Sequence, residues 1–241
     1  MTMNKALALA ATALLAATPL HAQGMLDLSL DIGGGVELGP RYPGSDEGRT
    51  SPWVILRNGA DADGQGFTIS PSFGFKGGRD SGDDDALAGL DEIDRTVELG
   101  LRLGYGIGPV GAYATLRRGF GGHEGITGAV GAKYRTELSP ELTLWSGVQA
   151  VYGNGAFNDT YFGVTEAESA ASGLPETSVG SGFNEAALTF EARYAVSDAT
   201  SLLGEVRYAR LIGDAADSPV VQEEYQPSLR LGLVRRFSFG F

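Results

Sequence analysis

The ten residues TVELGLRLGY, at positions 96–105, decide the fold of this chain. Val, Leu and Tyr occupy every second position, and Thr, Glu, Gly and Arg occupy the positions between them. A period of two places each set on its own face of a β-strand. One face is continuously apolar while the other carries full charges. This pattern fits a strand of a membrane barrel, with lipid outside and a polar lumen inside.

The same alternation recurs along the chain. Short connections follow the even-numbered segments, and mostly long ones follow the odd-numbered segments, except for the turn around 119–124. This sorting is typical of an outer-membrane barrel whose short turns face the periplasm. The sequence predicts an all-β fold, a transmembrane antiparallel up-and-down β-barrel of about ten strands. The predicted strands are 26–37, 51–59, 65–76, 93–105, 110–119, 125–137, 142–153, 183–196, 201–212 and 227–241.

Composition limits the possible functions. The 241 residues include 37 Gly and no Cys, which excludes disulfides and cysteine-based catalysis or metal binding. A formal net charge of −12 is unsuited to nucleic-acid binding. Residues 1–22 have the pattern of a signal peptide, with Lys5 before an Ala/Leu-rich stretch and a cleavage site after Ala22. Residues 23–241 are then the barrel, located in the outer membrane and surrounded by its lipid.

Charged residues on the lumen face can be paired across hairpins. If facing residues in the hairpin around 197–200 sum to 398, Glu191 faces Arg207 and Arg193 faces Glu205. A sum of 215 in the earlier hairpin places Glu98 opposite Arg117. Opposite charges on facing strands stabilise a ladder. We therefore expect a lumen packed with ion pairs, and a small polar pore or binding lumen is the alternative.

The C-terminal residues Phe237, Phe239 and Phe241 alternate on one face of the last segment. A terminal Phe with alternating aromatics resembles the recognition signal of the machinery that assembles outer-membrane barrels. We therefore expect this strand to close the barrel against the first strand.

The long connection 154–182 is too apolar for a solvated linker. Thr165 and Glu168 form a candidate capping box, and Gly173 is a stop signal, which together predict one short helix at about 165–172. Tyr161 and Phe162 are expected to anchor this helix at the barrel mouth. The neighbouring loop carries two candidate hydrogen-bond acceptors for it, Asp214 and Asp217.

Evidence for catalysis is weak. His123, next to Glu124, is the only histidine after residue 22. A hydrolase using His123 with Ser139 or Ser172 is the least favoured interpretation, because no Gly-x-Ser-x-Gly turn is present. The acidic loop 80–94 offers oxygen ligands for a divalent cation, but its spacing does not match an EF-hand. We predict no enzymatic activity, no cofactor and no metal.

Several longer strings occur together, namely YPGSD at 42–46, DDALAGLDEIDRTVELG at 84–100, HEG at 123–125, YFGVTEAESAASGLP at 161–175 and RLIGDAADSPVV at 210–221. Through these strings the chain resembles the MipA/OmpV family, the MltA-interacting outer-membrane proteins of Gram-negative bacteria. The resemblance implies a scaffold that joins a lytic murein transglycosylase to a murein synthase. Other members resemble adhesins or porin-like channels. The stretch between Trp53 and Phe67 is shorter than is usual in the family, which leaves twelve strands as the family-based alternative, and we expect a monomer.

Overall fold

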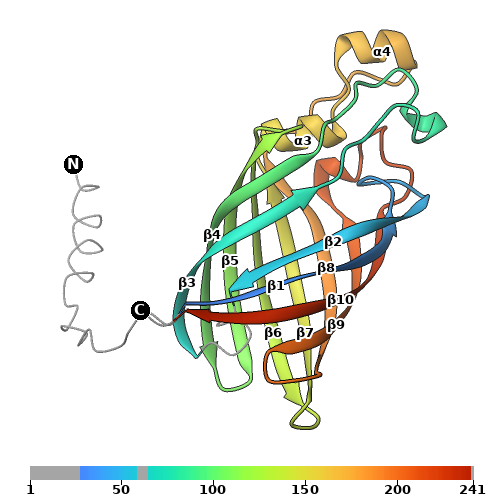
Figure 1. The fold of residues 1–241 in the computed structure, drawn as a ribbon. Helices are drawn as coiled ribbons and strands as arrows, with labels where there is room; N and C mark the ends of the chain where they lie inside the picture. The colour runs from blue at the N-terminus through green and yellow to red at the C-terminus, as the bar shows by residue number, and fades with distance from the viewer. Residues whose placement is uncertain (1–27, 59–64, 240–241) are drawn as a thin grey trace, which may run out of the picture.

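The computed structural model describes residues 28–58 and 65–239, and its strands form one curled antiparallel sheet (Figure 1). The prediction of an all-β barrel of ten strands is confirmed, with boundaries that differ from the predicted ones by a few residues. The predicted signal peptide and Phe241 lie outside the described residues. The strands are β1 Leu28–Pro40, β2 Gly48–Asn58, β3 Gly66–Lys76, β4 Thr96–Ile107, β5 Val110–Gly121, β6 Ile126–Glu137, β7 Leu142–Gly153, β8 Gly182–Ala195, β9 Thr200–Leu211 and β10 Tyr225–Phe239.

The strand order is that of an up-and-down barrel with one seam. From β3 to β10 each strand pairs with the next along the chain, and β1 pairs with both β2 and β10. Leu30 faces Phe237 and Leu38 faces Leu229 in the β1–β10 ladder, so the last strand does pack against the first. Among the described residues, no ladder joins β2 to β3, which are the two ends of the sheet.

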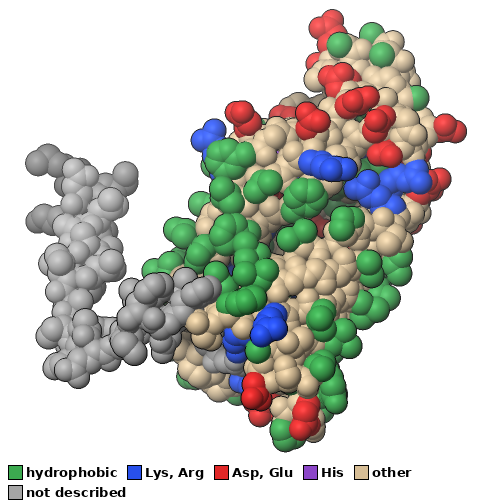
Figure 2. All heavy atoms as spheres, in the orientation of Figure 1, with side chains coloured by type: hydrophobic (Ala, Val, Ile, Leu, Met, Phe, Trp, Pro, Cys, Tyr) green, Lys and Arg blue, Asp and Glu red, His purple; other side chains and the backbone are tan. Residues whose placement is uncertain are grey.

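The two faces of the sheet have opposite chemistry. In β4, Leu101 and Tyr105 are 58% and 56% exposed, whereas Glu98 is 3% exposed and Thr96 is fully buried. Figure 2 shows hydrophobic side chains spread over the strands, and acidic side chains on the loops that carry the helices and at the opposite end of the barrel. An apolar belt around a polar interior is what the hydrocarbon core of a bilayer requires.

Glycines let β1 and β10 approach closely. A Cβ on inward-facing Gly33 would overlap the backbone carbonyl of Leu233, and the same holds for Gly35 and Leu231. By contrast, a Cβ on Gly34 would meet only the Trp53 carbonyl, at an ordinary 3.7 Å. The wall of a small barrel can therefore bend at this pair of strands.

We expect Gly33→Ala to destabilise the barrel by about 1–3 kcal/mol, because the new methyl group has no room against β10. Gly34→Ala is the matched control and should unfold like the wild type. Urea titrations in detergent micelles, followed by tryptophan fluorescence, measure both. Equal stability of the two variants would contradict the close approach of β1 and β10.

The long loops form an ordered lid over one end of the barrel. It contains helices α3 (Gly155–Phe162) and α4 (Glu166–Ser172) and the 3₁₀ turns η1 (Asp85–Leu87) and η2 (Gly213–Ala215) (Figure 1). Two buried clusters hold these segments together, and each joins residues from different loops. The first contains Ile93, Phe157, Tyr161, Phe162, Val179, Leu211 and Ala215, and the second contains Tyr42, Leu87, Leu90, Val164 and Val220.

The predicted helix is α4. Thr165 caps it, the Thr165–Glu168 capping box is formed, and Gly173 ends it in the left-handed conformation with φ 78°. The expected position of this helix at the barrel mouth was wrong. Helix α4 lies above the mouth, against the 85–91 loop (Figure 1). There the backbone of Ala171 and Ser172 contacts Gly89. The helix at the mouth is α3, which the sequence analysis did not predict and which contains Tyr161 and Phe162.

Glu168 links α4 to the rest of the lid. Its carboxylate accepts hydrogen bonds from the backbone N–H groups of Thr165 (2.8 Å) and Asp91 (2.9 Å). Burial, the largest single effect, would raise the pKa of Glu168, but these backbone hydrogen bonds together with the Thr165 hydroxyl and the charge of Arg79 lower the pKa overall. The ionised form is therefore the one that holds the lid. This stabilisation is complete above the unfolded-state pKa and is lost as the pH falls through the lowered folded pKa.

Glu168→Ala should loosen the lid by about 0.5–2 kcal/mol, the usual cost of a lost cap. Limited proteolysis at neutral pH should then cut faster between Tyr161 and Pro175. Glu166→Ala removes an exposed carboxylate from the same helix without touching the cap, so its cutting rate should stay at the wild-type value. Equal acceleration in both variants would show that the capping contacts do not hold α4.

Every helix in the described ranges 28–58 and 65–239 is too short or too polar to cross a bilayer.

Candidate functional site

A cavity of about 580 Å³ occupies the lumen below the lid. Phe157 and Phe162 of α3 line it at the lid end. Ile55 and Leu203 also line it, and they pack with Val234 in a cluster that is at most 2% exposed. Beyond Ile55 in β2, Arg57 and Asn58 line the same cavity, so the chamber extends past this apolar cluster toward the short turns.

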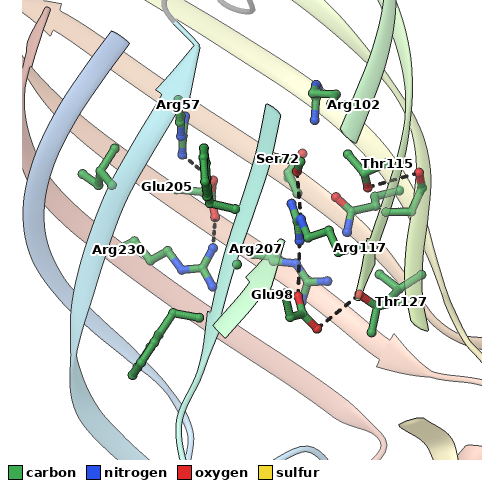
Figure 3. Close-up of a pocket in the computed structure, with 18 of the residues that line it drawn as sticks. Arg57, Ser72, Glu98, Arg102, Thr115, Arg117, Thr127, Glu205, Arg207 and Arg230 are labelled. Atoms are coloured by element: carbon green, nitrogen blue, oxygen red, sulfur yellow. Dashed lines mark hydrogen bonds and ion pairs between the residues drawn. The ribbon is translucent and has the colours of Figure 1, made fainter. Parts of the chain in front are cut away.

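Charged side chains dominate the chamber wall. Within the described residues, eight Lys or Arg and six Asp or Glu line it, so the chamber is net basic although the whole chain has a net charge of −12. Figure 3 shows two chains of polar contacts in the chamber, which we call the Glu205 network and the Glu98 network. A polar, water-filled lumen is where a membrane barrel can keep ionised groups.

The Glu205 network joins three parts of the wall. Arg230 of β10 contacts Glu205 of β9 at 2.8 Å and Glu37 of β1 at 2.9 Å. Arg57 of β2 contacts Glu191 of β8 at 2.7 Å and Glu205 at 3.8 Å. Because these pairs cross the lumen, they tie β2, an end strand of the sheet, to the opposite wall.

The Glu98 network lies under the lid. The Glu98 carboxylate accepts a hydrogen bond from Thr127 Oγ1 (3.1 Å) and contacts Arg117 Nη1 (3.6 Å) and His123 Nε2 (3.3 Å). Arg117 Nε also donates to Ser72 Oγ at 2.8 Å. The network therefore connects the barrel wall to the His123 turn that supports α3.

Both predicted registers were wrong by two residues. Facing residues in the β8–β9 hairpin sum to 396, so Glu191 faces Glu205 and Arg207 faces Thr189. The cause is the length of the turn. Residues 197–199 form it, and the backbone N–H of Val196 donates a hydrogen bond across it to the carbonyl of Thr200.

In the β4–β5 hairpin facing residues sum to 217, because Gly108 and Pro109 alone form the turn and Gly108 adopts φ 54°. Glu98 then faces Gly119 rather than Arg117. The Glu98–Arg117 ion pair still forms, but diagonally.

The partners of the other predicted pairs change with the register. Arg207 binds Glu185, and Arg193 binds Asp31 of β1. Asp31 also accepts from Arg236 Nε at 2.8 Å. The lumen is lined by ion pairs as expected, but most of them reach across the chamber or to a neighbouring strand.

His123 is completely buried and lies edge-on to two lid aromatics, with ring centroids 5.0 Å from Phe157 and 5.7 Å from Tyr161. Burial raises the pKa of Tyr161 to about 12, so its phenol stays neutral at neutral pH. Ser139 lies in the β6–β7 turn at the other end of the barrel, and Ser172 Oγ donates to the Glu168 carbonyl. The structure thus does not bring His123 to either candidate nucleophile.

The other predicted site residues have mixed positions. Tyr161 and Phe162 are 2% exposed in the core of the lid, whereas Glu124, Asp214 and Asp217 are exposed.

The 213–221 loop contacts α3 through residues that the sequence analysis did not single out. Ser218 Oγ donates to the Phe162 carbonyl at 2.6 Å, and Ala215 packs in the first buried cluster of the lid. Among the described residues, no group of three or more acidic or His side chains could hold a metal ion, and this includes the acidic loop 80–94.

An antiparallel barrel with an apolar outer belt and a charged lumen defines an outer-membrane β-barrel protein. The chain belongs to the family described as MltA-interacting protein MipA, which matches residues 32–237. It is located in the outer membrane. A search of curated proteins found no match.

Three solved structures with a similar fold are the following. An outer-membrane channel from Pseudomonas putida F1 is 14% identical, with a TM-score of 0.47, and the match covers 88% of this chain and 96% of that one. The NanC porin is 9% identical, with a TM-score of 0.39 and coverage of 86% and 98%. Neisserial surface protein A is 10% identical, with a TM-score of 0.29 and coverage of 87% and 97%.

Ion-pair partners can be tested by double-mutant cycles. Arg207→Ala and Glu185→Ala should couple by about 0.5–3 kcal/mol in urea unfolding, because each leaves a charge without its partner. Arg207→Ala and Glu191→Ala should be additive within about 0.5 kcal/mol. Coupling between Arg207 and Glu191, with additivity between Arg207 and Glu185, would instead support the register that places Arg207 opposite Glu191.

Proposed function

We propose that this protein is a monomeric outer-membrane scaffold that binds murein-degrading and murein-synthesising enzymes at its periplasmic rim. The description of its family names a partner, and the family resemblance identifies that partner as a lytic murein transglycosylase. The observation that carries the proposal is the ordered lid, whose two buried clusters cover one end of the lumen. A lumen covered in this way is less suited to conducting solutes than an open pore is.

The short turns are the surface that a periplasmic enzyme would meet. An exposed apolar side chain flanks each of three turns, namely Ile107, Leu138 and Val196, with exposures of 66%, 58% and 61%. Acidic side chains accompany them, because Glu141 lies in the same turn as Leu138 and Asp198 follows Val196 closely. Apolar side chains next to acidic ones fit a protein partner better than they fit lipid alone.

One of these turns is also rigid. Ser139 Oγ accepts hydrogen bonds from the backbone N–H groups of Glu141 (3.3 Å) and Leu142 (3.1 Å). Its hydroxyl donates a hydrogen bond to the Glu141 carboxylate at 3.0 Å. A turn held by its own side chains loses little conformational entropy when a partner binds.

Site-specific photo-crosslinking in intact cells tests this function. A photoreactive residue at Asp198, in a short turn, should give adducts with a lytic murein transglycosylase or a murein synthase. The same residue at Ala170, exposed on α4 at the opposite end, is the control and should give none. Murein-enzyme adducts from position 170 alone would contradict the periplasmic rim as the binding surface.

A narrow porin-like channel is the alternative within the same fold, and an adhesin is a second one. Stable ohmic conductance of the purified protein in planar bilayers would favour the channel over the scaffold. Adducts to extracellular proteins at position 170 would favour the adhesin. A hydrolytic activity that is lost in the His123→Ala variant would support the enzyme hypothesis.

A further inference from the structure

The seam between β2 and β3 opens the lumen cavity toward the membrane. These strands are neighbours around the barrel, yet within the described residues no ladder joins them (Figure 1). Seven consecutive residues of β2, 52–58, and six of β3, 71–76, line the cavity. Consecutive residues include both inward and outward side chains. The cavity therefore reaches the free edges of both strands.

The mouth of the seam lies in the apolar belt. Outward side chains beside it are Val54 on β2, 66% exposed, and Ile69 and Phe75 on β3, 60% and 52% exposed. Open strand edges are tolerated at membrane depth only where they line a polar cavity. The lid covers one end of the lumen, and the seam opens into the apolar belt, so the seam is the route by which a molecule dissolved in the membrane would enter.

Two cations flank the outer end of the seam. Arg49 on β2 reaches across it, and its guanidinium occupies the place that a Cβ on Gly77, just after β3, would need. Lys76, the last residue of β3, places its ammonium over the rings of Phe157 (5.1 Å) and Tyr161 (5.9 Å). In the part of the chain that the structure describes, neither cation has a carboxylate within ion-pair distance.

Lys76 and Glu98 attract each other without forming a direct ion pair. The Lys76 ammonium lies in the electrostatic field of Glu98, but the oxygens of that carboxylate already contact Arg117, His123 and Thr127. An anion placed between β2 and β3 could therefore bind both cations without breaking an existing ion pair.

We propose that the seam is a binding site for an amphiphile with one anionic headgroup and one acyl chain. Arg49 and Lys76 clamp the headgroup at the level where the strands meet the lid. The acyl chain extends down the seam toward Trp53 and Ile55 and enters the cavity from the side. This orientation matches that of an amphiphile in a membrane leaflet, and a cavity of about 580 Å³ lies in the range that takes a small ligand.

The chain carries its own reporters for this site. It has two tryptophans, Trp53 and Trp145, and both line the cavity. The full-length protein in phosphatidylcholine vesicles is titrated with cis-parinarate, a fluorescent fatty acid, and energy transfer from tryptophan is recorded. Laurate should compete with the probe. Dodecanol, which lacks the charge, and acetate, which lacks the chain, should not.

Charge variants test the clamp. Lys76→Met and Arg49→Met should each raise the apparent Kd for cis-parinarate by roughly tenfold, the effect of one lost charge-assisted hydrogen bond. Lys76→Arg should retain binding. Arg235→Met, which removes an exposed cation remote from the seam, is the matched control and should bind like the wild type. Heat-modifiable migration on gels checks that each variant is folded.

A crosslink tests the route. Because the chain has no cysteine, Val54→Cys and Phe73→Cys can be joined across the seam by a short bis-maleimide. The crosslinked protein should lose the rise in energy transfer, while the same double variant without the crosslinker should keep it.

Unchanged uptake after crosslinking would overturn the lateral route. Wild-type affinity in both Met variants, or competition by dodecanol or acetate equal to that by laurate, would overturn the amphiphile site. None of these results bears on the murein scaffold, because the assay contains no periplasmic protein.

Discussion

The hydrogen bonding of backbone groups inside the bilayer is the constraint on which the structure depends. A sheet that spans a membrane must satisfy its own N–H and C=O groups, and this chain does so by pairing β10 with β1. That ladder requires the strand backbones to approach closely, which explains Gly33 and Gly35 at the points of contact. The seam between β2 and β3 is the place where the described residues do not meet this constraint, so the strand edges there face the cavity instead.

Ion pairs across the lumen follow from the curled shape of the sheet. Once the sheet curls, side chains from strands far apart in sequence, such as Arg57 and Glu191, face each other over a short distance. These pairs neutralise charges that would otherwise be costly in a confined space, and they tie an end strand to the opposite wall. The ion pairs in the lumen thus hold the sheet in its curled form.

The lid is stabilised by different interactions from those in the lumen. Its stability comes from apolar residues of four loops that pack into two clusters, and from Glu168, which connects α4 to the loop at Asp91. Many acidic residues gather on this exposed end, whereas the chamber below is net basic. The separation gives the protein a solvated outer surface and an interior suited to anions.

The sequence by itself determined the strands, their number, their two faces and helix α4. These features follow from local rules: alternation with a period of two, and the Thr165–Glu168 capping box closed by Gly173. Tertiary structure alone decided the register, because a shift of two residues keeps the alternation and only the turn geometry around Gly108 and Ala199 selects between the options. It also decided helix α3, whose Gly, Asn, Asp and Thr residues are weak helix formers and which is stabilised by burial of Tyr161 and Phe162. The ion-pair partners and the seam depend on which strands meet across the lumen, and no local pattern records that.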